Sequence, residues 1–386
     1  MRLDLARRAG KSVAAIWRLD SVPSTTPQKA RELRTRSRRI RWTRHLVQAG
    51  TAGLVLWIGH DFVRWVRALE SGQAAGVRPP GVEGFLPIAA LMSLRHLWSA
   101  GEIHAVHPAG LVILLAIVGT GLLLKKAFCS WLCPVGTLAE MLAAVGITAF
   151  ARRVRLPRVL DVPLRGLKYL LLLFFVHAIF VSMSPAAIAA FLDAPYNRVA
   201  DVKLLYFFER LSPFALKLVA VLVVLSMVVP YAWCRYLCPY GALLGALSVL
   251  SPLKVTRHAP SCIDCGLCTK ACPSLLPVHR LGRVRSDECS GCLSCVAACP
   301  VTRALRVETP PPWRRAVRPA VFACLVLLLF GGTIQAARVW GVWRNGITDE
   351  EYAAHLEEIE FYDHLRGGAP SAAPSERAGA GEEQAR

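Results

Sequence analysis

The chain has 386 residues, of which 54% are hydrophobic and only 19% are charged. Its mean hydropathy of +0.41 is high for a soluble globular protein and indicates a membrane protein. The formal net charge is +20, but a charge excess argues for a nucleic-acid partner only when it gathers on a soluble basic surface. The basic residues gather in alternate segments between apolar stretches, as a membrane topology explains. We therefore expect no nucleic-acid partner.

The predicted elements begin with a basic segment, residues 1–44, which we expect to be cytoplasmic. Five apolar stretches follow, each close to the ~20 residues that cross a ~30 Å hydrocarbon core. They predict transmembrane helices at residues 45–66, 107–124, 167–184, 214–231 and 319–337.

The segments between these stretches are alternately basic and balanced in charge. Residues 125–168 hold 8 basic and 2 acidic side chains, and residues 231–318 hold 12 and 4, whereas residues 67–106 hold 3 and 3. Basic segments are retained on the cytoplasmic side of a membrane. The alternation therefore predicts a cytoplasmic N-terminus and an external C-terminus, and it accounts for the net charge.

Two of the apolar stretches run into similar sequences, FCSWLCPVGTLAEMLAAV at 128–145 and WCRYLCPYGALLGALSVL at 233–250. The repeat predicts that residues 45–254 form a membrane core of two parallel hairpins, whose Cys-x3-Cys-Pro motifs face each other at the cytoplasmic surface. Two cysteines four residues apart would share one face of a helical turn. The repeat would then bring together the four thiols of Cys129, Cys133, Cys234 and Cys238.

Those four thiols could ligate a third [4Fe-4S] cluster. They could instead form thiol-disulfide switches or a site for a soft metal such as copper, or they could simply be packed. Cys324 stands alone in the fifth apolar stretch and is expected to be a small core residue.

A ferredoxin-like segment is predicted at residues 255–308, where the spacing C-x2-C-x2-C-x3-C-P occurs twice. In this spacing three thiolates surround one cubane, and the cysteine before the proline reaches the other cluster. Zinc ribbons use paired cysteines and have no use for a third evenly spaced one. We therefore predict two [4Fe-4S] clusters, the first held by Cys262, Cys265, Cys268 and Cys299 and the second by Cys289, Cys292, Cys295 and Cys272. Gly266 and Gly291 would let the backbone approach the clusters.

Ionisable residues within an apolar stretch are candidates for function. His60 and Asp61 lie in the first stretch and are our candidates for the groups that accept protons from a quinol. An interfacial role for them is an equal alternative. Haem is not expected, because His177 and His60 differ in predicted depth and the chain lacks Cys-x-x-Cys-His.

The fifth stretch with its flanks, residues 309–340, precedes an acidic external tail, residues 341–386. The tail is expected to open with a helix that Thr348 caps and whose first turn is acidic. The helix could dock a redox partner or could simply be solvated.

The two Cys-x3-Cys-Pro motifs followed by a two-cluster segment resemble the membrane polyferredoxin family that includes NapH, NosR and CcoG, over roughly residues 105–305. The resemblance implies a bacterial inner-membrane protein that transfers electrons between the quinone pool or a cytoplasmic carrier and a respiratory partner. It carries over the eight ferredoxin cysteines and, without a settled role, the four cysteines of the repeat. NapH-like quinol dehydrogenase subunits are the nearest, although the fifth span and the acidic tail depart from them.

The expected fold is an all-α polytopic membrane protein with about five transmembrane helices and a small α+β bacterial-ferredoxin-like domain. We expect electron transfer through [4Fe-4S] clusters. A CcoG-like copper reductase or assembly factor is the alternative, and a redox-sensing membrane protein is a further one.

Overall fold

The computed structural model describes residues 27–74, 76–150, 156–359 and 362. This part of the chain is mostly helical, as predicted, and contains one small sheet. Residues 1–26 of the basic N-terminal segment and most of the acidic tail after Glu358 lie outside it. The chain divides into two compact units, which we take in turn. Unit 1 consists of Met1–Leu54, Ile117–Leu173 and Ala215–Gly332, and unit 2 of Val55–Ala116, Phe174–Phe214 and Thr333–Arg386.

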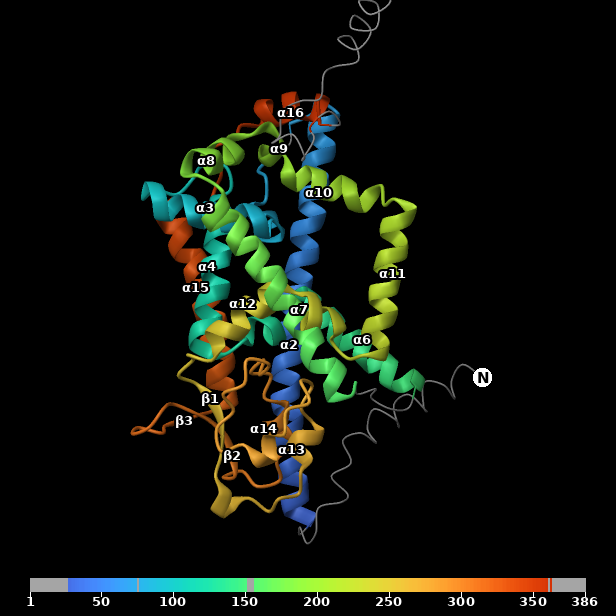
Figure 1. The fold of residues 1–386 in the computed structure, drawn as a ribbon, viewed down its shortest axis with the longest axis vertical. Coiled ribbons are helices and arrows are strands. Elements are labelled where there is room, and N and C mark those ends of the chain that lie inside the picture. The colour runs from blue at the N-terminus through green and yellow to red at the C-terminus, as the bar shows by residue number, and fades with distance from the viewer. Residues whose placement is uncertain (1–26, 75, 151–155, 360–361, 363–386) are drawn as a thin grey trace, which may run out of the picture. The chain divides into compact units, whose positions relative to one another are not determined.

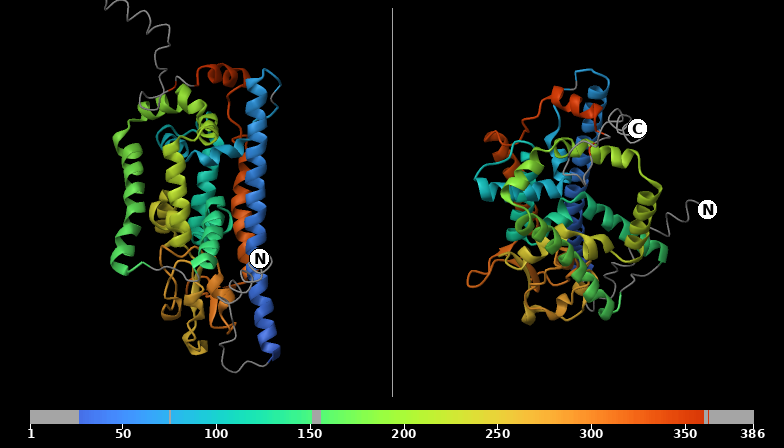
Figure 2. Two further views of the ribbon diagram at one scale, coloured as in Figure 1. Left: turned by 90° about the vertical axis from the view of Figure 1, so that its right-hand side faces the viewer. Right: turned by 45° about the horizontal axis from the view of Figure 1, so that its top comes forward.

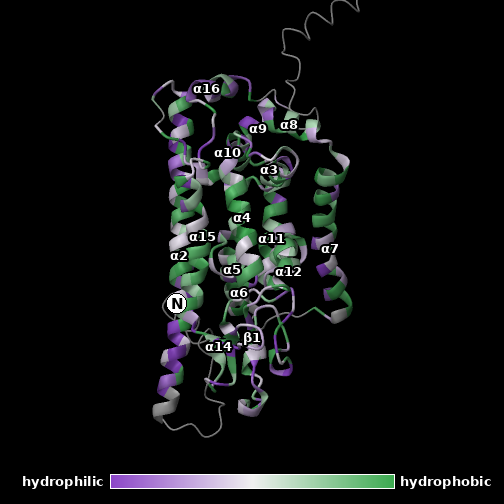
Figure 3. Ribbon diagram, turned by 90° about the vertical axis from the view of Figure 1, so that its left-hand side faces the viewer, coloured by the Kyte–Doolittle hydropathy of each residue, from purple (hydrophilic) through white to green (hydrophobic). Residues whose placement is uncertain are grey.

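Four helices contribute at least one turn to each unit: α2 (Pro27–Glu70), α4 (Pro108–Leu124), α7 (Arg158–His177) and α15 (Pro319–Val339). Figure 3 shows that α4 and α15 are apolar along most of their length, whereas the first turns of α2 are hydrophilic. The remaining helices of unit 1 that precede its sheet are α5 (Ala127–Trp131), α6 (Pro134–Phe150), α11 (Pro213–Val228), the π-helical turn η4 (Trp233–Leu237) and α12 (Pro239–Ser248).

Helices lie at all five predicted spans, and several of them begin at a proline, which has no N–H to leave unsatisfied in the first turn. Among the described residues, three helices are long and apolar enough to cross a membrane: residues 31–70, 159–182 and 319–339. A fourth span results if α10 (Ala200–Glu209) and α11, which meet at 83°, are taken together. Helix α4 is apolar but has only 17 residues.

The segment predicted to be ferredoxin-like contains a three-stranded antiparallel sheet of β1 (Lys254–Arg257), β2 (Leu305–Glu308) and β3 (Ala316–Val317). Val255 lies opposite Val307, which lies opposite Val317. Short helices connect β1 to β2 and gather beside these strands (Figure 1; Figure 2). They are η5 (Ala259–Ser261), α13 (Leu267–Lys270), η6 (Val278–Arg280) and α14 (Ser294–Ala298).

The largest apolar core of unit 1 joins this segment to the membrane helices. Val255, Val307 and Leu293 pack in one cluster with Trp131 of α5 and Phe322 of α15. All of them are less than one-tenth exposed. The segment is therefore part of the same packed unit as the Cys-x3-Cys-Pro motifs.

Unit 2 contains the parts of α2, α4, α7 and α15 that lie outside unit 1, and the segments that connect them. Gly101 follows α3 (Pro87–Ala100) and lies in the left-handed region at φ 79°. Thr348 caps α16 (Asp349–Glu357) by accepting a hydrogen bond from the N–H of Glu351. This cap confirms the predicted acidic helix. The elements of unit 2 are η2 (Pro80–Phe85), α3 (Pro87–Ala100), the π-helical turn η3 (Ala178–Ser182), α8 (Pro185–Asp193), α9 (Pro195–Arg198), α10 and α16 (Asp349–Glu357).

Candidate functional site

A first hollow of about 360 Å³, partly open to solvent, is lined by four cysteines of the two-cluster segment. The turn into α13 supplies three of them, and Gly266 in that turn has a φ of 68°, a conformation that side chains disfavour. Burial raises the pKa of Cys299 to about 11, and the nearby thiols of Cys268 and Cys265 add to the rise. The hollow brings together Cys262, Cys265, Cys268 and Cys299.

A second hollow of about 360 Å³ is lined by the other four cysteines. Burial, followed by the thiol of Cys292, raises the pKa of Cys272 to about 12. The set is Cys272, Cys289, Cys292 and Cys295. In each hollow, three cysteines come from one C-x2-C-x2-C-x3-C-P sequence and the fourth comes from the other. The two sets are those that the spacing predicts. Their role as cluster ligands stays a prediction.

The Cys-x3-Cys-Pro motifs differ from the continuous helical turn that we predicted. Cys129 lies in α5 and Cys234 in the π-helical turn η4, but the second cysteine of each motif lies outside the helix. Proline disfavours helical backbone in the residue before it, so each chain breaks at Cys-Pro and a new helix begins at the proline. Cys238 becomes the N-cap of α12, and its Sγ accepts a hydrogen bond from the N–H of Gly241 at 3.3 Å.

The glycine that follows each Cys-Pro has a steric reason. A Cβ on Gly136 would lie 2.0 Å from the carbonyl oxygen of Cys129, and one on Gly241 would lie 3.0 Å from that of Cys234. The second helix of each motif thus starts directly against the backbone of the first cysteine. This close approach keeps the two cysteines of each motif near each other.

The four cysteines of the two motifs lie close enough to influence one another. Burial raises the pKa of Cys129 to about 12, with the thiol of Cys133 as the next cause and that of Cys238 also contributing. The pKa of Cys234 is likewise raised, by burial and then by Cys238, Cys129 and Cys133. All four are partly buried. The structure therefore gathers the thiols that the repeat predicted to meet.

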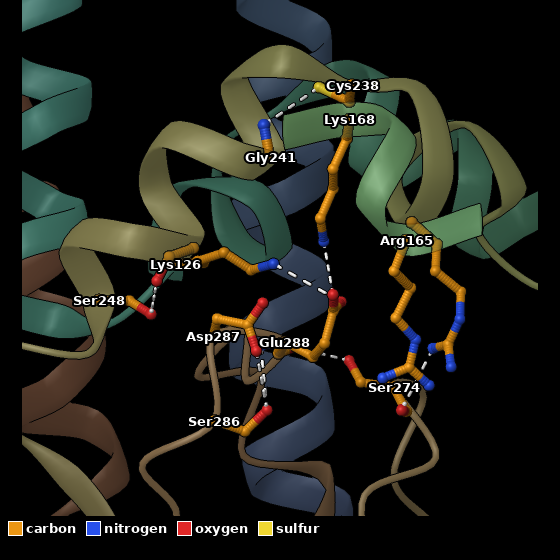
Figure 4. A network of polar contacts seen from close by, with 12 residues as sticks. Lys126, Arg165, Lys168, Cys238, Gly241, Ser248, Ser274, Ser286, Asp287 and Glu288 are labelled. Atoms are coloured by element: carbon orange, nitrogen blue, oxygen red, sulfur yellow. Dashed lines mark hydrogen bonds and ion pairs between the residues drawn. The ribbon is translucent and has the colours of Figure 1, made fainter. Parts of the chain in front are cut away.

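A buried ionic network adjoins these cysteines (Figure 4). The Nζ of Lys168, on α7, donates to Glu288, and the Nζ of Lys126 lies 3.8 Å from the same carboxylate. The three side chains are at most 7% exposed. Both ammonium groups counteract the burial that raises the pKa of Cys238, after the stronger effect of the Gly241 N–H. Sequence reasoning missed this network, although paired lysines after an apolar stretch were a signal for it.

Two lysine side chains also lie near Cys289 of the second hollow. Lys125 donates through Nζ to the carbonyl oxygens of Ser286 at 2.9 Å and Ser248 at 3.1 Å. Burial raises the pKa of Cys289, whereas the N–H of Gly291, and then Lys125 and Lys126, lower it. Lys126 thus acts on cysteines of both the repeat and the second hollow.

Direct hydrogen bonds join the Cys-x3-Cys-Pro motifs to the chain around the second hollow. Ser130 Oγ donates to the carbonyl of Ser290 at 2.7 Å, and Trp131 Nε1 donates to that of Gly291 at 3.1 Å. These acceptors lie between Cys289 and Cys292.

The second motif makes the equivalent contact on the other side of the hollow. Arg235 donates through Nη1 to the carbonyl of Ser274, two residues after Cys272, at 3.2 Å. Both motifs therefore contact the second hollow through backbone that flanks its cysteines.

In unit 2, His60 is exposed and Asp61 is partly buried, both on α2. Within the described part of the chain, neither has a hydrogen bond or an ion pair with another residue. His177 is exposed, with Nδ1 3.3 Å from the Oγ of Ser182. The role of His60 and Asp61 as proton acceptors stays a prediction.

A buried ionic cluster in unit 2 has no cysteine partner. Arg78 donates to Glu83 at 2.8 Å and to Asp201 at 2.6 Å, and all three side chains are nearly inaccessible. His107 donates through Nε2 to the carbonyl of Asn197 at 2.6 Å, and its Nδ1 lies 3.8 Å from Glu83. Burial pushes the pKa of Glu83 upward, but His107 and Arg78 outweigh it and hold that pKa low.

No three His, Cys, Asp or Glu side chains of the described residues converge closely enough to hold a single metal ion. Thiolates on a cubane bind four separate irons, so they do not need to meet at one point. The donor set of each hollow consists of four thiols with backbone N–H groups nearby, which fits such a cluster.

Comparison with protein families agrees with this donor chemistry. The 4Fe-4S binding domain matches residues 106–157 and 211–258, so that each match includes one Cys-x3-Cys-Pro motif. The 4Fe-4S dicluster domain matches residues 254–300. Fold and site therefore define a largely helical iron–sulfur protein with 4Fe-4S binding domains.

Among curated proteins, the putative electron transport protein YccM of Escherichia coli strain K12 is 44% identical over 315 residues, which cover 80% of this chain and 88% of that one. Protein NirI of Paracoccus denitrificans is 31% identical over 56% of this chain and 31% of its own length. The ferredoxin-type protein NapH of E. coli is 26% identical over 54% and 70%. No solved structure matches the chain significantly. The chain belongs to the NapH/NosR-like polyferredoxin family, together with YccM.

Proposed function

We propose that the protein relays electrons at the cytoplasmic side of a bacterial inner membrane. The electrons would pass through three centres that cysteines hold. Iron–sulfur electron transfer is supported by the family and by the electron transport named for YccM. When bound, a [4Fe-4S] cluster accepts and releases one electron at a time. The protein sets the position and potential of the clusters and performs no bond chemistry of its own.

The ligand sets of two centres follow the two hollows. Cys262, Cys265, Cys268 and Cys299 would hold the first cluster, and Cys272, Cys289, Cys292 and Cys295 would hold the second. The membrane centre would be a third [4Fe-4S] held by the four cysteines of the repeat, Cys129, Cys133, Cys234 and Cys238.

The observation that carries the relay is the contact between the repeat and the second hollow. Cys129 and Cys289 are connected through Ser130 and Ser290 by covalent bonds and a single 2.7 Å hydrogen bond. This hydrogen bond from a side chain to the backbone gives the two centres a short bonded path. We infer the order membrane centre, second cluster, first cluster.

The decisive experiment measures iron and acid-labile sulfide per chain in anaerobically purified protein, with EPR after dithionite reduction. We expect about twelve irons in the wild type and about eight when the four repeat cysteines become serine, because each cubane holds four. The matched control is Cys324→Ser. Cys324 is exposed and not the core residue that we expected, and its replacement should leave the iron unchanged. About eight irons in every protein would reject the third cluster and favour copper or disulfide chemistry at the repeat.

We propose that the five predicted spans place the two-cluster segment in the cytoplasm and α16 outside. The apolar character of α4, α11 and α15 supports this topology. A cysteine introduced near Thr348 should react with a membrane-impermeant maleimide in intact spheroplasts, and one at Arg315 should react only after lysis. The reverse pattern would contradict the orientation.

The donor that we propose is quinol, reached from the lipid at the exposed His60 of α2, with Asp61 beside it. A quinol releases two protons as it loses two electrons, and these side chains would accept them. Replacing both, His60→Ala with Asp61→Asn, should slow cluster reduction by a soluble quinol at unchanged iron content. An unchanged rate would move the quinol site elsewhere.

A further inference from the structure

The first hollow includes an exposed cysteine, whereas no cysteine of the second hollow is exposed. Cys265 is exposed, and Ile263 beside it is 53% exposed. In the second set Cys272 and Cys295 are buried. Of the two cysteine sets, the first is thus the one that a partner protein in solution could approach.

The surface around this opening is basic. Arg257 lines the hollow itself, Lys270 ends the helix that starts at Gly266, Arg280 follows the lining residue His279, and Arg303 lies two residues after the lining residue Val301. Lys270, Arg280 and Arg303 are exposed. We call these four residues, with the central Ile263, the basic face.

Carboxylates offset only part of this charge, that of Arg257. Within residues 254–308, all of which are described, Asp264 is the only exposed acidic residue, and Arg257 donates to it at 2.9 Å. Glu308 is buried and pairs with His258 at 2.7 Å. Glu288 belongs to the buried lysine network. The exposed charge around the opening is therefore positive.

We propose that the basic face docks a small acidic carrier protein that exchanges one electron with the cluster held at Cys262, Cys265, Cys268 and Cys299. An apolar centre with a charged rim is the anatomy of a transient protein interface, and opposite charge speeds the encounter. The inference rests on the proposed function, because it needs a cluster in the first hollow.

The exchange is a single electron transfer. In the relay from quinol, the centre in the first hollow loses one electron and is oxidised, and the carrier gains it and is reduced. In the test below the same exchange runs in reverse, from a reduced carrier to the centre. No bond forms or breaks and no proton is transferred. Anionic lipid headgroups are the competing use of a basic surface, but they would not require it to surround an exposed cysteine.

The test uses the full-length protein in nanodiscs of neutral lipid and an acidic [2Fe-2S] ferredoxin, reduced beforehand, as the probe. Stopped-flow absorbance gives the second-order rate constant of electron transfer at several salt concentrations. We expect the constant to fall with salt, and the double variant Lys270→Glu with Arg303→Glu to lower it about tenfold or more at low salt. A basic one-electron carrier should show the opposite salt dependence.

The matched control is Arg315→Glu, an exposed arginine of the β2–β3 hairpin, which Figure 1 shows well apart from α13. It should leave the rate constant unchanged. Equal losses in the control and the double variant, or no salt dependence in the wild type, would overturn the docking proposal. So would an effect of the variants seen only in nanodiscs with anionic lipid, because the face would then serve the membrane.

Iron content and the EPR signal of each protein separate the two proposals. If the wild type lacks a cluster in the first hollow, the proposed function fails before docking is tested. If the double variant loses iron, the salt dependence of the wild type with the acidic and the basic carrier still decides the question.

Discussion

The two units each bury an ionic network, and the networks differ in charge balance. In unit 2, the guanidinium of Arg78 pairs with the two carboxylates of Glu83 and Asp201, and the ring of His107 lies beside Glu83, so the fixed cations do not outnumber the carboxylates. In unit 1, Lys125, Lys126 and Lys168 lie among only two carboxylates, those of Asp287 and Glu288. Buried charge is costly unless it is compensated.

A cluster held by the cysteines beside it, as proposed, would explain the surplus cation of unit 1. Four thiolates and a [4Fe-4S] core carry a net negative charge, and this charge increases when the cluster is reduced. Lysines next to such a centre would compensate it. Unit 2 has neither cysteines nor a surplus of cations, which is the pattern of a network that only stabilises the fold. The following changes test that contrast, starting with the largest expected effect.

Arg78→Met should destabilise the protein most. It leaves Glu83 and Asp201 buried without their shared cation, and breaking a buried ion pair costs about 3–5 kcal/mol. Thermal unfolding in detergent should show the loss. The control is Arg67→Met, which removes an exposed arginine paired with Glu70 and Glu209 and should leave the midpoint unchanged. Equal midpoints for both variants would contradict a stabilising role for the buried cluster.

Gly136→Ala should have the next largest effect and should act on the membrane centre. Its Cβ would lie 2.0 Å from the carbonyl of Cys129, so α6 must move, and overpacking of this kind costs about 1–3 kcal/mol. We expect about four irons per chain to be lost while the ferredoxin signals persist. Gly241→Ala, where the same contact is 3.0 Å, is the milder matched variant. A greater iron loss in Gly241→Ala would contradict the steric explanation.

Lys126→Met should make the midpoint potential of the membrane centre more negative, because the reduced cluster carries more negative charge and loses a cation. A tenfold change in the ratio of reduced to oxidised centre corresponds to about 59 mV for one electron. EPR-monitored redox titration measures it, and Lys126→Arg should restore the value. If Lys126→Met leaves the potential unchanged with full iron content, the surplus charge has another cause.

How much the sequence could predict depends on the range of the interactions. The grouping of Cys268 with Cys299 follows from local spacing, and it was predicted. A helix that begins at Pro134 or Pro239 follows from the proline itself, whereas the position of Cys133 and Cys238 outside the preceding helical turn was missed. The pairing of Lys168 with Glu288 spans 120 residues, and no local pattern specifies such a partner. The buried setting of His107 was missed for the same reason, because Glu83 and Asn197 come from distant segments.

Ser130→Ala should have the smallest effect and tests whether the contact between the two centres matters for transfer. The variant removes one hydrogen bond, worth about 1 kcal/mol, and leaves the Trp131 contact in place. Iron content and both potentials should be unchanged, whereas the rate from membrane centre to second cluster should fall in freeze-quench EPR. Thr137→Ala, which removes a local hydrogen bond within the same motif, is the control. Since Ser130 carries no charge, a slower rate at constant potential would separate the role of contact from the role of the lysines. A shifted potential instead would mean that Ser130 acts on the centre itself and not on the path between the two.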